Sequence, residues 1–405
     1  MAMLHDFWEN FRHNLFKPLL LFFYMGFLVP ILGVELDFPH VIYQGLTIYL
    51  LLAIGWKGGE ELAELAGSKL GEAASFMGVG FVTNFIIGIA AYFALRAFTR
   101  LRKIDAATVA GYYGSDSAGT FVTCVGVLTS INMAYDAYMP VMLAIMEIPG
   151  CLVALYLVSR LRNEGMDALG NMPFEPGYNP NAKPIVLEHL GHGHVHDVSE
   201  AEAERREQLL AEDALSLQTN GNQSKPKKGF SPELLHEVFL NPGLYLLFGG
   251  IIIGFIARKQ GEKVTHDDDN LFLSLFQGLL CLFLLEMGMT ASKKLKDLRA
   301  AGWPFIAFAL IAPNVFATFG ICVAHAYCLF TGHQLEPGTY VIFAVLCGAA
   351  SYIAVPAVQR LAIPEASPTL PLAASLGLTF SYNVTIGIPV YIQIAKLVTA
   401  AFPHS

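Results

Sequence analysis

The sequence predicts an all-α membrane protein that crosses the bilayer ten times, as two five-helix repeats of opposite orientation. Three observations predict this fold. The 405 residues are 54% hydrophobic and only 14% charged, whereas soluble domains carry about 25% charged residues. Uncharged stretches near 20 residues, the length that spans a bilayer, recur along the chain. Short motifs also recur in the same order in the two halves. These patterns argue against a soluble protein with a large core.

Ten apolar stretches account for the expected spans. They run over residues 17–36, 39–57, 72–98, 105–128, 137–160, 240–258, 270–291, 302–328, 338–361 and 370–399. Residues 1–16 precede them as a polar and aromatic segment without a cleavable signal pattern, which we expect to lie at the membrane interface. The chain therefore divides into this segment, a first five-helix repeat (17–160), a linker (161–239) and a second, inverted five-helix repeat (240–400).

The linker is rich in Pro, Asn, Gln, Glu and Lys, and we expect it to be cytoplasmic and partly disordered. Four histidines cluster in it: His189, His192, His194 and His196. Such a run can bind Zn²⁺ or Ni²⁺, but we favour a flexible solvated loop. The sequence has no basic patch that would indicate binding of nucleic acid. The six cysteines lie in apolar stretches without a CxxC pattern, as is typical of small buried residues.

Matching motifs indicate an internal duplication. The matched pairs are Pro18 and Gly26 with Pro242 and Gly250, Gly55 with Gly288, Gly114 and Ser117 with Gly348 and Ser351, and Ile148-Pro149 with Ile388-Pro389. The spacing between partners grows slowly along the chain, as small loop insertions would produce. An odd number of spans in each repeat places the halves in opposite orientations. This inverted repeat is a common plan of secondary transporters.

The distribution of Lys and Arg predicts the orientation. Clusters over residues 96–103 and 293–299 fall in loops on the same side as the linker. Positive residues accumulate on the cytoplasmic side of membrane proteins. We therefore expect both termini to be extracytoplasmic and the linker to be cytoplasmic, in a plasma or inner membrane.

Two spans are interrupted at matching places. Gly111–Thr120 lies in the fourth span and Cys347–Pro356 in the ninth. Small residues and proline weaken helices, so each span is expected to break near its middle. The backbone groups freed by a break need water, an ion or protein as partners, because lipid cannot supply them. A matched pair of breaks is a pointer to a transporter's substrate site.

Acidic residues occur inside the expected spans. Asp116 lies in the first break, and an unpaired carboxylate near the bilayer centre is costly. We expect it to bind Na⁺, take up a proton or meet a cation; an aspartate at a water-filled helix mouth is the alternative. Glu147 and Glu286 are further intramembrane acids. A helix-packing hydrogen bond is the alternative for Glu147, and a structural role is the alternative for Glu286.

Hydroxyl and amide side chains offer further oxygen atoms near the breaks. They are Ser115, Ser117, Thr120, Ser351, Asn383 and Thr385. Packing or a back-bond to the helix is the usual role of such residues, but several in one glycine-rich break favour ligand binding. Hard cations prefer oxygen ligands. Lys57 is expected to snorkel at the membrane edge, with an anion-facing role as the alternative, and Asn84 and Asn314 are expected to make packing contacts.

Several motifs resemble the sodium-dependent bicarbonate transporter family, of the cyanobacterial symporter type. The resemblance rests on Gly278-Leu279-Leu280, Met287-Gly288-Met289, Leu295, residues 310–313, Ile148-Pro149, Gly114 to Thr120, Ala362-Ile363-Pro364 and Ser367-Pro368. It implies ten helices in two inverted repeats, crossed broken helices in a core domain, a gate domain and a homotrimer. It also implies Na⁺ beside bicarbonate between the breaks, and in some members a PII-like cytoplasmic regulator.

The chain departs from that family pattern at the breaks. The cyanobacterial branch carries an aspartate after the serines of the second break, where this chain has Tyr352. The first break instead holds Asp116, where that branch is apolar. The acid has changed sides, which marks a divergent branch.

The sequence thus predicts a Na⁺-coupled symporter of a small anion, bicarbonate above others, with no enzymatic activity and no organic cofactor. The expected anion-binding residues are Gly114, Ser115, Ser117, Ala118, Gly348, Ala349, Ala350 and Ser351. The expected sodium-binding residues are Asp116, Thr120, Glu147, Ser351, Asn383 and Thr385. The alternatives are a Na⁺/H⁺ antiporter-like exchanger that uses Asp116, and a non-transport sensor that signals through the linker. An intramembrane serine hydrolase is disfavoured, because no histidine lies near Ser115 or Ser117 in the sequence.

Overall fold

The computed structural model describes residues 16, 18–64, 67–181, 242–295, 302–352 and 354–402. The regular structure in these ranges is entirely helical. Within these ranges, six helices are long and apolar enough to cross a membrane. The histidine cluster (His189, His192, His194 and His196), most of the N-terminal segment, and the loop residues Lys296 and Arg299 lie outside the described residues.

Each expected span contains helix, and the two expected breaks are present. The first half contains α2 (Pro18–Leu32), α3 (His40–Glu64), α4 (Gly67–Phe98), α5 (Lys103–Tyr113), α6 (Ala118–Ser130) and α7 (Met139–Asn163). The second half contains α10 (Pro242–Gln260), α11 (Glu262–Asp269), the π-helical turn η1 (Asn270–Ser274), α12 (Phe276–Lys294), α13 (Trp303–Thr331), α14 (Pro337–Gly348), α15 (Ala354–Ala362), α16 (Thr369–Leu372), the π-helical segments η3 (Ala373–Phe380) and η4 (Asn383–Gly387), and α17 (Ile388–Ala401). The interrupted helices are too short to count as single spans, because the breaks divide them.

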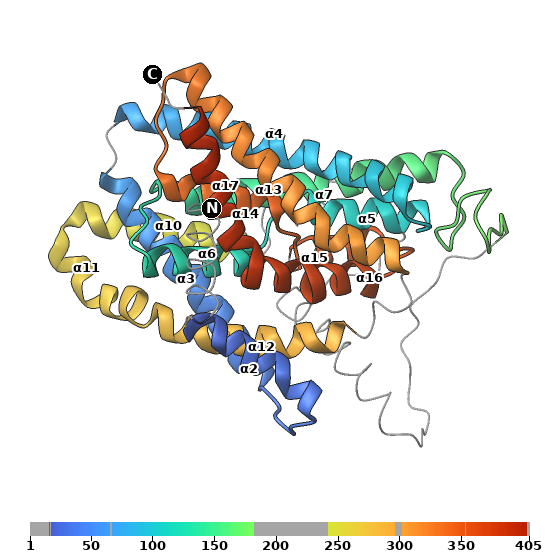
Figure 1. Ribbon diagram of the computed structural model, residues 1–405, viewed down its shortest axis with the longest axis horizontal. Coiled ribbons are helices and arrows are strands. Elements are labelled where there is room, and N and C mark those ends of the chain that lie inside the picture. Colours follow the sequence, from blue (N-terminus) through green and yellow to red (C-terminus); the bar gives the residue numbers. More distant parts are fainter. Residues whose placement is uncertain are drawn as a thin grey trace.

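Two helix pairs bring one half of the chain against the other. Helix α2 packs along α12, and α3 packs along α10 (Figure 1). Glycines let the backbones touch: a Cβ on Gly26 or Gly288 would overlap the carbonyl oxygen of Leu285 or Phe23, respectively. Close approach at small residues is the usual way in which helices associate in lipid.

The same kind of contact joins α3 to α10. A Cβ on Gly55 would lie 2.5 Å from the carbonyl oxygen of Leu247, and one on Gly254 would overlap the carbonyl oxygen of Trp56. The residues that the sequence matches between the halves, Gly55 and Gly288, therefore occupy equivalent contacts in the two helix pairs.

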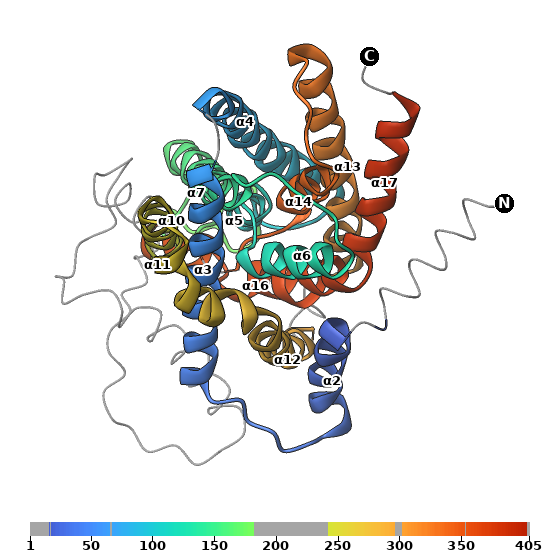
Figure 2. The same cartoon turned by 90° about the vertical axis from the view of Figure 1, so that its left-hand side faces the viewer.

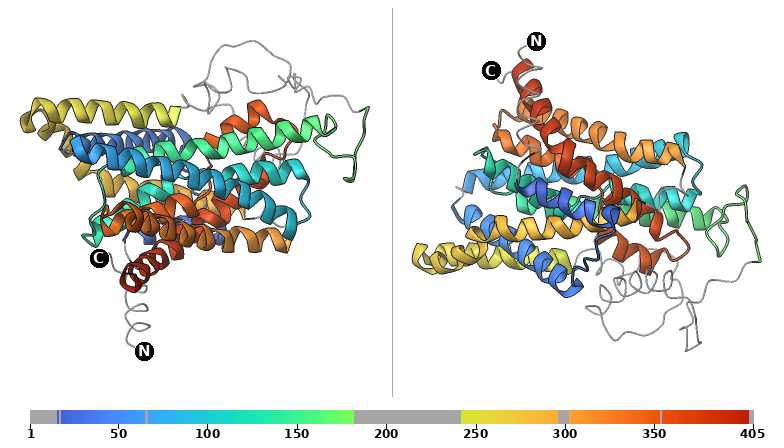
Figure 3. Two further views of the ribbon diagram at one scale, coloured as in Figure 1. Left: turned by 90° about the horizontal axis from the view of Figure 1, so that it is seen from above. Right: turned by 60° about the horizontal axis from the view of Figure 1, so that its bottom comes forward.

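The interrupted helices lie in the interior of the molecule. Every residue of α5 from Ile104 to Tyr113, and of α14 from Gly338 to Gly348, is buried. Figure 2 shows α5, α6 and α14 in the middle, with α4, α13 and α17 on one side and α3 and α12 on the other. Protein therefore surrounds the breaks. Helix α17 is steeply inclined to the long helices α4 and α7 (Figure 3).

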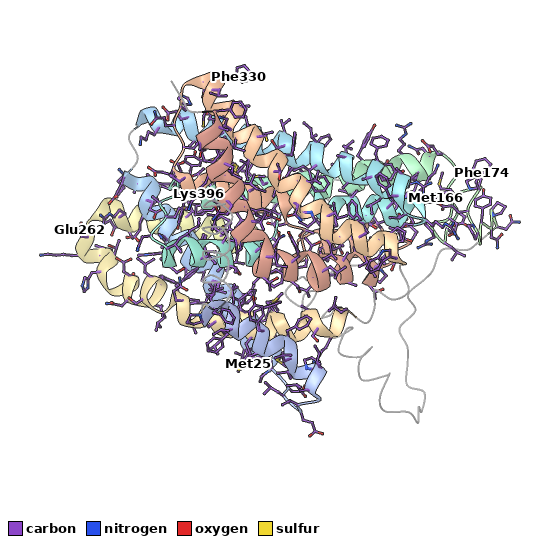
Figure 4. All side chains as sticks on the ribbon, in the orientation of Figure 1. Met25, Met166, Phe174, Glu262, Phe330 and Lys396 are labelled. Carbon is purple, nitrogen blue, oxygen red and sulfur yellow. The ribbon has the colours of Figure 1, made fainter. Side chains whose placement is uncertain are left out.

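The chain beyond α7 folds back on the helix ends. Arg102 forms a two-bond ion pair with Asp105 and donates to the carbonyl oxygen of Leu169 at 3.0 Å. Arg162 forms a second ion pair with Glu365, at 2.8 Å. Figure 4 places Met166 and Phe174 at one end of the molecule and Glu262 at the opposite end. The start of the linker is thus tied to the ends of α5, α7 and α15.

Candidate functional site

The first break runs from Gly114 to Ser117. The N–H of Gly114 donates to the carbonyl oxygen of Ala110 at 2.9 Å and closes α5. A Cβ on Gly114 would lie 2.8 Å from the Cα of Gly88 in α4, so only glycine fits there without a shift. Ser117 then caps α6: its Oγ accepts from the N–H of Thr120 at 3.3 Å and from its Oγ1 at 2.9 Å. A serine cap of this kind satisfies one of the free N–H groups of a helix start.

The second break runs from Gly348 to the start of α15. Ala349 is extended, and the Oγ of Ser351 accepts from the N–H of Val355 at 3.4 Å. A Cβ on Gly348 would lie 2.7 Å from the carbonyl oxygen of Pro313 in α13. Each break therefore has a glycine pressed against a neighbouring helix and a serine that bonds to the backbone of the following half-helix.

A backbone hydrogen bond joins the two breaks. The N–H of Ser351 donates to the carbonyl oxygen of Tyr112 at 2.8 Å. That oxygen belongs to the last turn of α5, where carbonyl groups have lost their intrahelical partners. The second break thus supplies the partner that lipid could not, and the two breaks form one unit.

A carboxylate without a partner lies in the first break. Asp116 is 1% exposed, and within the described residues neither of its oxygens has a hydrogen-bond partner. Glu147 of α7 lies within electrostatic range of Asp116, and its carbonyl oxygen accepts from the Oγ of Ser115 at 2.9 Å. A buried carboxylate in this state is costly, so the site has the chemistry to hold a cation or a proton.

Asn84 of α4 contributes to the same place. Its Nδ2 donates to the carbonyl oxygen of Met146 at 2.9 Å, whereas its Oδ1 is buried without a partner within the described residues. Its backbone oxygen would lie 3.2 Å from a Cβ on Gly114. The sequence predicts only a packing contact for Asn84; its single amide gives no signal of its position beside the break.

Asn383 and Thr385 already make side-chain hydrogen bonds, and Lys57 forms an ion pair. The side-chain nitrogen of Asn383 donates to the carbonyl oxygen of Gly348 at 2.9 Å, and its oxygen accepts from Tyr391 at 2.6 Å. Thr385 bonds back to the carbonyl oxygen of Ser381 at 2.7 Å. Lys57 lies 3.8 Å from Glu61 and over the ring of Tyr135, as a membrane-edge lysine would.

Glu286 lies on α12, outside the two breaks. Its Oε1 accepts from the Oγ1 of Thr290 at 2.9 Å. This bond within one helix agrees with a structural role, which is the alternative that the sequence allows for Glu286.

The two helix ends give the breaks complementary polarity. The start of α6 presents N–H groups and the positive end of a helix dipole, which attract anions. The end of α5 presents carbonyl groups, and Asp116 adds two oxygens of the kind that hard cations prefer. An anion and a cation can therefore be held side by side between the breaks.

Buried, interrupted helices in a multi-pass helical protein define the class of membrane transporters with broken helices. A sequence model of the Na⁺-dependent bicarbonate transporter superfamily matches residues 18–396. The chain belongs to that superfamily, in agreement with the resemblance in its sequence. A comparison with curated proteins found no match.

Proposed function

We propose that the protein is a Na⁺-coupled symporter that imports a small anion, bicarbonate above others, by alternating access. The observation that carries the proposal is the buried carboxylate of Asp116, which has no partner within the described residues and lies just before the N-terminus of α6. Na⁺ at Asp116 would neutralise this carboxylate and allow an anion to approach the same break. Family membership supports Na⁺ and bicarbonate as the pair.

The geometry supports the following proposed roles. Asp116 and Glu147 would contribute carboxylate oxygens to Na⁺, with Thr120 and the second break nearby. The anion would contact residues 114–118 and residues 348–351, where the start of α6 offers N–H groups. Asn383 would position the end of α14 through its bond to Gly348.

The proposed transport movement shifts the broken-helix body against the paired helices. The backbone bond between Ser351 and Tyr112 supports movement of both breaks as one unit. The glycine contacts of α2 with α12 and of α3 with α10 support a separate gate, built from equivalent helices of two inverted five-span repeats. These contacts agree with the ten-span architecture that we propose.

The proposed orientation places the linker in the cytoplasm and both termini outside. Helices α4, α7 and α12 end toward the side marked by Phe174 (Figures 1 and 4) and carry basic residues in their last turns. Positive residues of this kind stay on the cytoplasmic side. We propose a homotrimer, and a PII-like regulator at the linker, on the family resemblance.

The decisive experiment is uptake of labelled bicarbonate into proteoliposomes of the purified protein. An inward Na⁺ gradient should drive accumulation, and an equal K⁺ gradient should not. Other small anions, tested as competitors, would identify the substrate. Na⁺-driven proton movement without any anion requirement would instead support the exchanger, and the absence of all Na⁺-dependent flux would refute the proposal.

A further inference from the structure

Tyr352 reaches from the second break into the first. It follows Ser351, whose N–H is bonded to Tyr112 at 2.8 Å, and this bond sets the second break against the end of α5. The Tyr352 hydroxyl lies beside the Ser117 side chain and the backbone N–H of Gly119. The phenol therefore stands at the start of α6, the part of the first break that attracts anions.

Gly119 makes room for this phenol. A Cβ on Gly119 would overlap the Tyr352 hydroxyl and would lie 3.2 Å from Cε1 of Phe283. Glycine is a poor helix former, and its use in the first turn of α6 is explained by this close approach. Any larger residue at position 119 would displace the tyrosine or the ring of Phe283.

The Tyr352 hydroxyl is buried and, within the described residues, has no partner with hydrogen-bond geometry. Ser117, which lies beside it, already accepts two bonds from Thr120, so both acceptor positions of its oxygen are used and it cannot accept from the phenol. An unpaired buried hydroxyl is unfavourable, and in the interior of a membrane protein no lipid group can relieve it. A ligand with acceptor oxygens, bound at the start of α6, would relieve it.

Aromatic rings hold Tyr352 on the side that faces the paired helices. Its ring meets Phe380 edge-on, with centroids 5.6 Å apart. Phe283 of α12, which adjoins Gly119, stacks on Tyr43 of α3 at 5.8 Å. Tyr352 thus lies where the breaks meet α3 and α12.

We propose that Tyr352 is an anion-binding residue, whose hydroxyl donates a hydrogen bond to an oxygen of the transported anion at the start of α6. This inference rests on the proposed function, and it adds Tyr352 to the anion-binding residues that the sequence predicts. Since bicarbonate has acceptor oxygens and a hydroxyl of its own, one phenol can donate to it or accept from it.

Na⁺-driven bicarbonate uptake in proteoliposomes tests the assignment with Tyr352→Phe, which keeps the ring and removes only the hydroxyl. Loss of a bond to a charged ligand should raise the KM for bicarbonate about tenfold or more. The Na⁺ concentration for half-maximal uptake should stay within about twofold. Tyr156→Phe on α7 is the matched control, because Tyr156 is 49% exposed on the surface of the molecule. The KM of this variant for bicarbonate should be unchanged.

Gly119→Ala gives an independent test through the steric contact. It should raise the KM for bicarbonate as well, and the double variant with Tyr352→Phe should be no worse than the poorer single variant, because both remove one interaction. An unchanged KM in folded Tyr352→Phe, or additive losses in the double variant, would overturn the assignment. If Tyr352→Phe does not fold, an unchanged KM in Gly119→Ala overturns it. A wild-type protein without Na⁺-dependent bicarbonate uptake would refute the proposed function instead.

Discussion

Asp136, in the loop after α6, and Thr339, at the start of α14, hold each other through two hydrogen bonds. Thr339 Oγ1 donates to Asp136 Oδ2 at 2.7 Å, and the N–H of Asp136 donates to Thr339 Oγ1 at 2.7 Å. At the start of α5, Asp105 accepts from the N–H of Ser367 at 2.9 Å. In each case the loop after one broken helix is fastened to the start of the other, so the two broken helices are clamped at both ends.

Thr339→Val should loosen one clamp without changing the shape of the side chain. It leaves the N–H of Asp136 without its partner and removes one of two hydrogen bonds to its Oδ2, which also accepts from the N–H of Glu336 at 3.2 Å. This should lower the free energy of unfolding by about 1–3 kcal/mol. Thermal unfolding in detergent measures this loss. Thr399→Val, which removes a back-bond near the end of α17, is the control and should change stability less. Equal effects of the two substitutions would argue against the clamp.

Asp116→Asn should separate function from stability. Removing the charge should reduce Na⁺-dependent uptake at least about 100-fold, because no other described carboxylate lies in the first break. The same change removes a buried charge without a partner, so the ion-free protein should become more stable, by about 1–3 kcal/mol. Na⁺-driven uptake checks the first effect, and thermal unfolding measured without Na⁺ checks the second.

Asp268→Asn is the matched control for this substitution, because Asp268 is an exposed aspartate of α11. It should leave uptake and stability unchanged. An Asp116→Asn variant that unfolds more easily than wild type would show that the carboxylate has a structural role, contrary to the proposed cation site.

Local chemistry in the sequence predicts the breaks well. Gly114 and Gly348 end their half-helices as the glycine-rich patterns indicate, and Ser117 and Ser351 bond to the backbone of the next half-helix. Apolar length likewise predicts where helices occur. These features depend on residues that are close together in the sequence, so the sequence alone predicts them. The linker histidines and the sodium and anion ligands stay predictions.

Contacts between residues that are distant in the sequence could not be predicted from it. The residues next to Tyr352 in the sequence do not indicate that its hydroxyl contacts Gly119, because this contact depends on how the two breaks pack together. The amide of Asn383 carries the pattern of an oxygen ligand, yet the fold uses both of its ends in hydrogen bonds to Gly348 and Tyr391. Side-chain type predicts the chemistry that is available, and tertiary packing decides where it is used.

Gly288→Leu should disrupt the pairing of α2 with α12. Even a Cβ there would overlap the carbonyl oxygen of Phe23, which is backbone and cannot rotate away. Overpacking at such a contact costs about 1–3 kcal/mol or more, so yield and thermal stability should fall. Gly278→Leu, on the same helix with open space at its Cα, should be tolerated. Equal tolerance at both positions would contradict the close helix contact.

Acid should loosen the start of the linker through Asp167. Burial raises the pKa of its carboxyl, but the backbone N–H groups of Asn179, Asn171 and Leu169 lower it more, so the pKa lies below its ordinary value. A lowered folded-state pKa contributes stability above the unfolded value, near 4, and this contribution disappears as the pH falls through the folded value. Residues 167–179 should therefore become more sensitive to acid-stable proteases below about pH 4.

Asp167→Asn should remove that dependence. The variant should be cleaved more readily than wild type at pH 7, and its cleavage should change little between pH 7 and pH 3, after correction for protease activity on an unfolded substrate. A wild-type protein whose cleavage within 167–179 is the same at both pH values would contradict the role of the carboxylate.

Asn383 and Tyr391 should act as one unit that fixes the end of α14. Tyr391 donates to Asn383 at 2.6 Å, and Asn383 donates to the carbonyl oxygen of Gly348 at 2.9 Å. Tyr391→Phe and Asn383→Ala should each lower the free energy of unfolding by about 1–3 kcal/mol, because each leaves a buried polar group unpaired. Together they should cost less than the sum of the two, since they break the same chain of bonds. Thermal unfolding of the four proteins in the cycle measures this coupling. Strict additivity would show that the two residues act separately.

If Asn383 instead ligates Na⁺, Asn383→Ala should weaken stabilisation by Na⁺ in the same unfolding assay, whereas Tyr391→Phe should leave it nearly intact.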